Sequence, residues 1–134
     1  MTASPDPSPH RFIDLLGMRI EREAERVVAR LTVDARHLQS NRVVHGSVLH
    51  ALLDSVMGIE SYLACGQDNV ATADLSVRFF EPVFDGELDA TARVLKVGAR
   101  LIVASGEVRR EGVVVAIGQG SFARIRRVTP EAAR

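Results

Sequence analysis

The sequence predicts an α+β fold in which an antiparallel sheet wraps around one long central helix. A strongly apolar segment begins at Val48 and ends around residues 64–66, which suits a helix covered on most sides. Alternating apolar and polar residues fill most of the chain before and after it, as in half-buried strands. At 134 residues the chain fits a single domain, which we expect over residues 11–128. We expect residues 1–10 to be a disordered lead-in and residues 129–134 a short tail.

Three elements are expected before the central helix. The apolar patch at residues 12–16 predicts one or two helical turns that end at Gly17. Weak alternation over residues 18–25 and clearer alternation over 26–33 predict the two strands of a hairpin. A polar loop over residues 34–42 then leads into the helix.

The central helix carries the most informative residue of the chain. Its polar exceptions, Ser47, His50, Asp54 and Ser61, lie three, four and seven residues apart and therefore share one narrow stripe. An ionised aspartate in a dry environment is costly unless it is paired, hydrogen-bonded or open to a cavity. Asp54 is therefore a candidate site residue.

Long strands are expected after the helix, as a meander of antiparallel strands. Glu111-Gly112 reads as a tight hairpin turn between the last two. One helix covers only one face of a sheet, so the other face or an edge strand requires another subunit. We expect a homodimer at least, and a tetramer built as a dimer of dimers. The expected strands are residues 70–80, 86–97, 101–109 and 113–126.

Composition excludes several classes of function. Acidic and basic residues cancel at 17 each, which argues against a nucleic-acid-binding protein. The basic cluster Arg124, Arg126 and Arg127 reads as a solvated strand end, or as a contact for cofactor phosphates at a pocket mouth. The single cysteine, Cys65, excludes an internal disulfide and reads as a small apolar residue. Residues 1–8 lack the features of a signal peptide and no run reaches membrane-spanning length, so we expect a cytoplasmic protein with no membrane partner.

Several segments, taken in order, resemble the hotdog-fold acyl-CoA thioesterases of the phenylacetate-degradation type, close to the 4-hydroxybenzoyl-CoA thioesterase branch. The resemblance covers residues 15–125. Its strongest part is VHGS followed by LLDS over residues 44–55, similar to the family's V-H-G-G and L-L-D-S. Its other parts are residues 70–72, 77–83, 86–88, 97–100 and 115–122.

The resemblance implies roles for five residues. Asp54 takes the position of the catalytic carboxylate, and Gly46 that of the glycine whose N–H binds the thioester oxygen. His45 precedes this glycine, as it does in the family. Gln39 stands where the family places an Asn or Gln near the thioester or the attacking water, and Thr72 where some members hold that water.

The resemblance also has two departures and implies a substrate. Ser47 replaces the second motif glycine, where it would narrow the pocket or alter specificity, and Arg42 stands where a glycine is usual. The implied activity is hydrolysis of a medium-chain or aromatic acyl-CoA, with no cofactor beyond the coenzyme A of the substrate. Met57, with its neighbour Val56, and Phe80 are expected to line the acyl pocket. Arg100 is the candidate contact for the coenzyme A phosphates; Arg78 is a second candidate that reads better as an exposed strand arginine.

Thioester hydrolysis suits these residue types, but it requires residues from two chains. A helix N-terminus offers free N–H groups for an oxyanion, and a carboxylate serves as general base or nucleophile. Asp54 lies roughly 12 Å along the helix axis from Gly46, which is too far for both to act on one thioester. We therefore expect Gly46, His45 and Gln39 of one subunit to meet Asp54 of the other.

Each of these residues also has a structural interpretation. Asp54 would cap a loop, His45 would bond a loop carbonyl, and Gln39 and Thr72 would satisfy backbone groups. A metal site of His45, His50 and Asp54 is a weak alternative, and a Ser47–His50–Asp54 triad is rejected because all three project from one helix face. Two other functions compete with hydrolysis. One is non-catalytic acyl-CoA binding as a sensor or scaffold, and the other is a hydratase, which would need a histidine where Ile59 stands.

Overall fold

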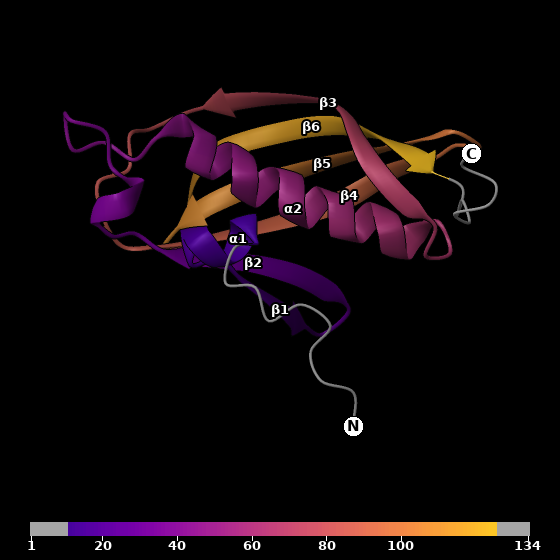
Figure 1. Cartoon of the computed structure of the whole chain (residues 1–134), viewed down its shortest axis with the longest axis horizontal. Helices are drawn as coiled ribbons and strands as arrows, with labels where there is room; N and C mark the ends of the chain where they lie inside the picture. The colour runs from indigo at the N-terminus through magenta and orange to yellow at the C-terminus, as the bar shows by residue number, and fades with distance from the viewer. Residues whose placement is uncertain (1–10, 126–134) are drawn as a thin grey trace.

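The computed structural model describes residues 11–125, which form a six-stranded antiparallel sheet with the long helix α2 (Gly46–Ala64) across one face (Figure 1). This confirms the α+β prediction and the hotdog fold that the resemblance implied. The other elements are α1 (Phe12–Leu16), the 3-10 helix η1 (Ala35–His37), β1 (Arg19–Glu23), β2 (Arg26–Thr32), β3 (Asn69–Phe79), β4 (Glu87–Val97), β5 (Leu101–Arg110) and β6 (Val113–Ile125).

The order of strands in the sheet is β1-β2-β4-β5-β6-β3. The predicted meander is therefore right for β4, β5 and β6 but wrong for β3. That strand pairs with β6 over most of its length and not with its successor β4, which pairs with β2 and β5 instead. The pairing leaves β1 and β3 as the two edges of the sheet.

Two turns confirm local predictions from the sequence. Gly17 ends α1 with φ at 73°, in the left-handed conformation that glycine adopts at little cost. Glu111 and Gly112, with φ of 49° and 87°, join β5 to β6. Positive φ at both central residues is the geometry of the two-residue turns that match the twist of a hairpin.

The core lies between α2 and the sheet. Leu52, Leu53 and Met57 of the helix are all 0% exposed. The helix approaches closely because Gly106 and Gly118 face it: a Cβ atom on either glycine would lie 3.1 or 3.0 Å from a methyl group of Leu53. Burial of a side chain of this size contributes about 1.5–3 kcal/mol, so the helix is fixed firmly against β5 and β6.

The edge strand β3 is exposed along most of its 11 residues. Figure 1 shows that it begins beside the C-terminal end of α2 and bends to run along the sheet next to β6. A long, exposed edge presents unpaired backbone groups that another chain can bind. β3 therefore leaves an edge open to pairing with another strand.

Several predictions concern residues outside the range 11–125. They are the lead-in at residues 1–10, the tail at 129–134, the basic residues Arg126 and Arg127, and the end of the predicted domain beyond residue 125. Within residues 11–125, no helix is long and apolar enough to cross a membrane.

Candidate functional site

The N-terminus of α2 is held by the loop before it. His45 has extended backbone angles, and its N–H donates to the carbonyl of His37 (2.9 Å). Val44 N–H donates to the carbonyl of Val83 (2.8 Å), which ties the loop to the segment after β3. The side chain of His45 makes no capping hydrogen bond, and Gly46 N–H has no acceptor among residues 11–125. The first N–H of the helix is thus free to bind an oxygen from outside.

Gly46 opens into a groove of about 330 Å³ between the start of α2 and the end of β3. A Cβ atom at this position would lie 3.1 Å from Cζ of Phe79. Only a glycine leaves room for the ring beside the helix start without displacing it. The other lining residues are Val43, Val44, Leu49, Phe80, Glu81, Pro82 and Val83.

Asp54 lies in a second groove, of about 270 Å³, two turns further along α2. Its Oδ1 accepts a hydrogen bond from the Thr72 hydroxyl of β3 at 2.6 Å. No donor to Oδ2 is present among residues 11–125, so this oxygen of the groove-lining residue has no partner there. The other lining residues are Phe12, Ser47, His50, Ala51 and Leu75.

A bulge in β3 aims Thr72 at Asp54. The pairing of β3 with β6 shifts between Thr72 and Asp74, which leaves one extra residue on β3. Beyond the bulge, Leu75 and Val77 pack against the core, and before it Val70 does the same. Val70 and Leu75 are five positions apart, so strict alternation would place them on opposite faces. The bulge restores Val70, and with it Thr72, to the helix side.

The two grooves are neighbours along the seam between α2 and β3. His50 lines the Asp54 groove, Phe79 lines the Gly46 groove, and their ring centroids lie 6.1 Å apart. Three residues of the polar stripe predicted on α2, Ser47, His50 and Asp54, line the same groove. Ser61 differs, because it is fully buried and its hydroxyl has no partner within the described part of the chain.

Some of the predicted site residues line one of the two grooves, and others lie elsewhere. Ser47 and Thr72 lie with Asp54, and Phe80 lies with Gly46. Gln39 lines neither groove; it sits in the loop before α2, where its N–H donates to the carbonyl of Val43 (2.8 Å).

Met57 and Arg100 are also remote from the grooves. Met57, like Val56, is 0% exposed and belongs to the core, where its Cε atom lies 3.6 Å from the Cβ position of Gly118. Arg100 is exposed in the turn between β4 and β5 and makes no ion pair among the described residues.

The structure explains the arginine that stands in place of a glycine. Arg42 has a φ of 67°, in the left-handed region that favours glycine. Its N–H donates to the carbonyl of Gln39 (2.8 Å), closing the tight turn that carries the chain to the helix.

Two groove residues were not expected from the sequence. Phe12 of α1 is 63% exposed and lines the Asp54 groove, and Phe79 of β3 lines the Gly46 groove. The alternation of β3 assigns Phe79 to the helix side of the strand, but it does not reveal which helix residue it meets. Nothing in the local pattern connects Phe12 to Asp54, more than 40 residues away.

Comparisons with known proteins agree with this geometry. The family model described as the thioesterase superfamily matches residues 41–117, which are 77 of the 134 residues. A Caenorhabditis elegans protein with an esterase name is 29% identical over 107 residues, covering 78% of this chain; the chain spans only 63% of that relative.

Solved structures extend the likeness. A thioesterase from Haemophilus influenzae shares the fold with a TM-score of 0.83 at 22% identity, covering 90% of this chain and 87% of its own. A Bacillus halodurans protein solved with CoA has a TM-score of 0.80 at 27% identity (87% and 79%). The phenylacetic acid degradation protein PaaI of Thermus thermophilus, solved as a mutant, has a TM-score of 0.77 at 26% identity (85% and 98%). The family match spans the helix, the Gly46 groove, every lining residue of the Asp54 groove except Phe12, and most of the sheet; the chain therefore belongs to the thioesterase superfamily.

Proposed function

We propose that this protein hydrolyses acyl-CoA thioesters with a medium-chain or aromatic acyl group, as a member of the phenylacetate-degradation type. The observation that carries the proposal is the Asp54 carboxylate, which lines an open groove and is held by Thr72 at 2.6 Å through one oxygen, while the other has no donor among residues 11–125. A carboxylate held in this way is fixed in position but keeps a lone pair available for chemistry.

The second requirement is a donor for the negative charge that develops on the thioester oxygen. Gly46 N–H is free at the start of a 19-residue helix, where the dipole also favours negative charge. A fixed backbone donor of this kind is worth about 3–4 kcal/mol of transition-state stabilisation in comparable sites. The lack of a side chain at Gly46 lets the substrate approach this N–H.

We propose that one chain supplies Asp54 and a second chain supplies Gly46. On one chain the two residues lie in separate grooves, about 12 Å apart along the helix. If two β3 edges pair antiparallel, the two α2 helices run in opposite directions beside each other. The start of each helix then lies opposite the middle of its partner, and twofold symmetry gives two equivalent sites. His45 and Gln39 would accompany Gly46 to the shared site.

The reaction then follows from the two groups. The thioester oxygen accepts from Gly46 N–H while water, or Asp54 itself, attacks the carbonyl carbon. As base, Asp54 takes the proton of the water; as nucleophile, it forms an anhydride that water opens. In both routes the carbon–sulfur bond breaks and CoA leaves as the thiolate. In the base route the thiolate takes the proton that Asp54 removed from water, and in the nucleophile route it takes a proton from solvent. A single turnover in ¹⁸O-labelled water tests the nucleophile route, because label enters the Asp54 carboxyl only if water opens an anhydride at that carbon.

The substrate assignment rests on the groove linings. The Gly46 groove is mostly apolar and includes Phe79 and Phe80, which favours an acyl chain or an aromatic acyl group. Ser47 adds a hydroxyl to the Asp54 groove and limits its width. Arg100, exposed and free of ion pairs among residues 11–125, would meet the CoA phosphates. CoA in the Bacillus halodurans structure supports the same class of substrate.

The test is thiol release from a panel of acyl-CoA substrates by the wild type and the Asp54→Asn variant. We expect the variant to lose at least about a hundredfold in turnover. Asp74→Asn is the matched control, because Asp74 lies just past the bulge of the same strand and is exposed. Full turnover by Asp54→Asn would remove the proposed role. Binding of acyl-CoA without release by the wild type would favour the non-catalytic alternative.

A further inference from the structure

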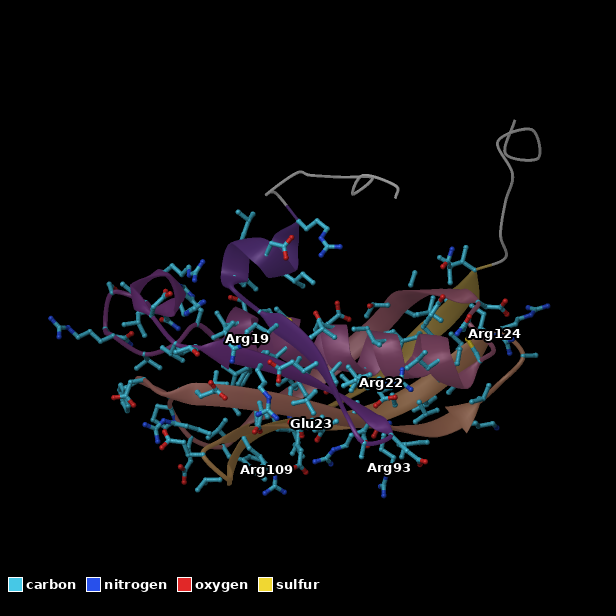
Figure 2. All side chains as sticks on the ribbon, turned by 90° about the horizontal axis from the view of Figure 1, so that it is seen from below. Arg19, Arg22, Glu23, Arg93, Arg109 and Arg124 are labelled. Carbon is cyan, nitrogen blue, oxygen red and sulfur yellow. The ribbon has the colours of Figure 1, made fainter. Side chains whose placement is uncertain are left out.

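A further cavity lies on the face of the sheet opposite α2 and shares no lining residue with either groove. It has a volume of about 630 Å³ and crosses β2, β3, β4, β5 and β6. Figure 2 shows Arg93 and Arg109 extending from this outer face, away from α2. The lining residues are Arg26, Ser76, Arg78, Thr91, Ala92, Arg93, Ser105, Gly106, Glu107, Ile117, Gly118 and Gln119.

Strand register shows how the residues that line this cavity are arranged. Ser105 of β5 pairs with Gln119 of β6 and with Arg93 of β4, so these three stand in one row across the sheet. The row next to it on the outer face contains Thr91, Glu107, Ile117 and Arg78. The central strands β5 and β6 thus contribute Ser105, Gln119, Glu107 and Ile117 to the cavity, and arginines stand on the strands at its two ends.

The arginines of the cavity are available for a ligand. Arg26, Arg78 and Arg93 have no carboxylate within 4.0 Å among residues 11–125. Seven other arginines of these residues are ion-paired: Arg11, Arg19, Arg30, Arg36, Arg109, Arg110 and Arg124. The one acid of the cavity, Glu107, is engaged by Arg109, so it does not cancel the positive charge at the ends.

The spacing of these arginines sets the size of the ligand. Arg78 on β3 is separated from Arg93 on β4 by two intervening strands, which places their backbones roughly 14 Å apart. Both side chains line the cavity, so a molecule that contacts both needs anionic groups at more than one point. The volume lies within the range of small-molecule sites, and guanidinium groups are suited to phosphate.

We propose that this cavity binds a phosphorylated small molecule with at least two negative charges, held by Arg78 at one end and by Arg93 and Arg26 at the other. Ser76, Ser105 and Gln119 supply hydroxyl and amide groups to the part of the ligand between the charges. The inference does not rest on the proposed hydrolysis, because it concerns the opposite face of the sheet and binding alone.

The test is calorimetric titration of the full chain with inorganic pyrophosphate at low salt. We expect saturable binding that weakens as salt is raised. Arg78→Gln and Arg93→Gln should each lower the affinity about tenfold, as expected for loss of a charged hydrogen-bonding partner. Arg22→Gln is the matched control, since Arg22 is exposed on β1, has no ion pair among the described residues and lies outside the cavity; its affinity should equal that of the wild type.

Two further titrations identify the source of the phosphate. Adenosine 3′,5′-bisphosphate and CoA carry the phosphates of an acyl-CoA. If they displace pyrophosphate and the Arg78→Gln variant raises KM for a thioester, the ligand is the nucleotide end of the substrate. If they do not displace it, the cavity takes a separate phosphorylated molecule. Both results support the proposal.

Three results would overturn it. The first is no saturable binding of pyrophosphate, adenosine 3′,5′-bisphosphate or CoA up to about 10 mM, a range that covers weak sites. The second is an equal loss of affinity in Arg22→Gln, which would indicate diffuse charge. The third is a smaller assembly of the Arg78→Gln and Arg93→Gln variants in sedimentation with pyrophosphate binding unchanged. In that case the face packs against a second copy of the chain.

Discussion

Replacing Thr72 by valine tests how the Asp54 carboxylate is held. Valine keeps the β-branched shape of threonine, so β3 should retain its packing, but the hydroxyl that donates to Asp54 at 2.6 Å is lost. A hydrogen bond to a charged group is worth about 1.5–3 kcal/mol, and partial exposure of this pair favours the lower end. A loss of about 1.4 kcal/mol in the transition state corresponds to a tenfold fall in kcat/KM.

The assay is thiol release from acyl-CoA substrates, with urea unfolding measured beside it. Thr72→Ser keeps the hydroxyl and should retain most of the activity, which separates the hydrogen bond from the shape of the side chain. If Thr72→Val hydrolyses every substrate at the wild-type rate while remaining folded, Thr72 serves β3 alone and the reasoning fails.

Three further predictions concern the approach to the site. Gly46→Ala keeps the N–H but places a methyl group 3.1 Å from Phe79. Activity should fall about tenfold, while the free energy of unfolding drops by less than about 1 kcal/mol because the half-exposed ring can move aside. Unchanged kinetics would contradict this prediction. Arg42→Gly relieves the strain of a non-glycine residue at a φ of 67°. It should raise the free energy of unfolding by up to about 1 kcal/mol, which is seen as a higher urea midpoint. A lower midpoint would show that the turn is unstrained. The hydrogen bond from the Arg36 side chain lowers the pKa of Asp34, so the ionised carboxylate stabilises the fold above its ordinary pKa and this contribution is lost as pH falls through the lowered pKa. The Tm advantage of the wild type over Asp34→Asn should therefore shrink from about pH 5 to about pH 3. A Tm difference that stays constant over this range would contradict the prediction.

The sequence predicted most of the secondary structure because each element carries its own periodic signal. The strand alternation placed β4 and β6 within one or two residues, and Glu111-Gly112 marked the final hairpin. The apolar surface of α2 predicted its burial. The sequence did not predict which strands pair. The position of β3 beside β6 depends on which strand edges remain free once β2, β4 and β5 have paired, and no local sequence pattern encodes that order.

The candidate site was predicted in part, for similar reasons. Asp54, Ser47 and His50 follow from helical spacing alone, and the structure places all three in one groove. Thr72 reaches Asp54 only because of the bulge before Asp74, and a bulge of this kind leaves no mark in the alternation.

Other residues show the limits of periodicity. Met57 looks like a pocket residue in an apolar helix, but the glycines of β5 and β6 bring the sheet so close that it is enclosed in the core. The gathering of Arg26, Arg78 and Arg93 on the outer face depends on register between strands far apart in the chain. These are tertiary facts that a single sequence does not display.

The central claim is that each site takes Asp54 from one chain and Gly46 from another, and complementation tests it most directly. The variants are Asp54→Asn and Gly46→Pro. Proline removes the N–H, and it suits the first position of a helix after His45, whose ψ of 134° is compatible with a following proline.

Each variant alone should be inactive. When the two are co-expressed in equal amounts, half of the dimers are mixed, and each mixed dimer has one intact site. The account predicts recovery of about a quarter of the wild-type activity. Activity that stays at the level of the single variants, in mixed dimers verified by two affinity tags, would contradict it.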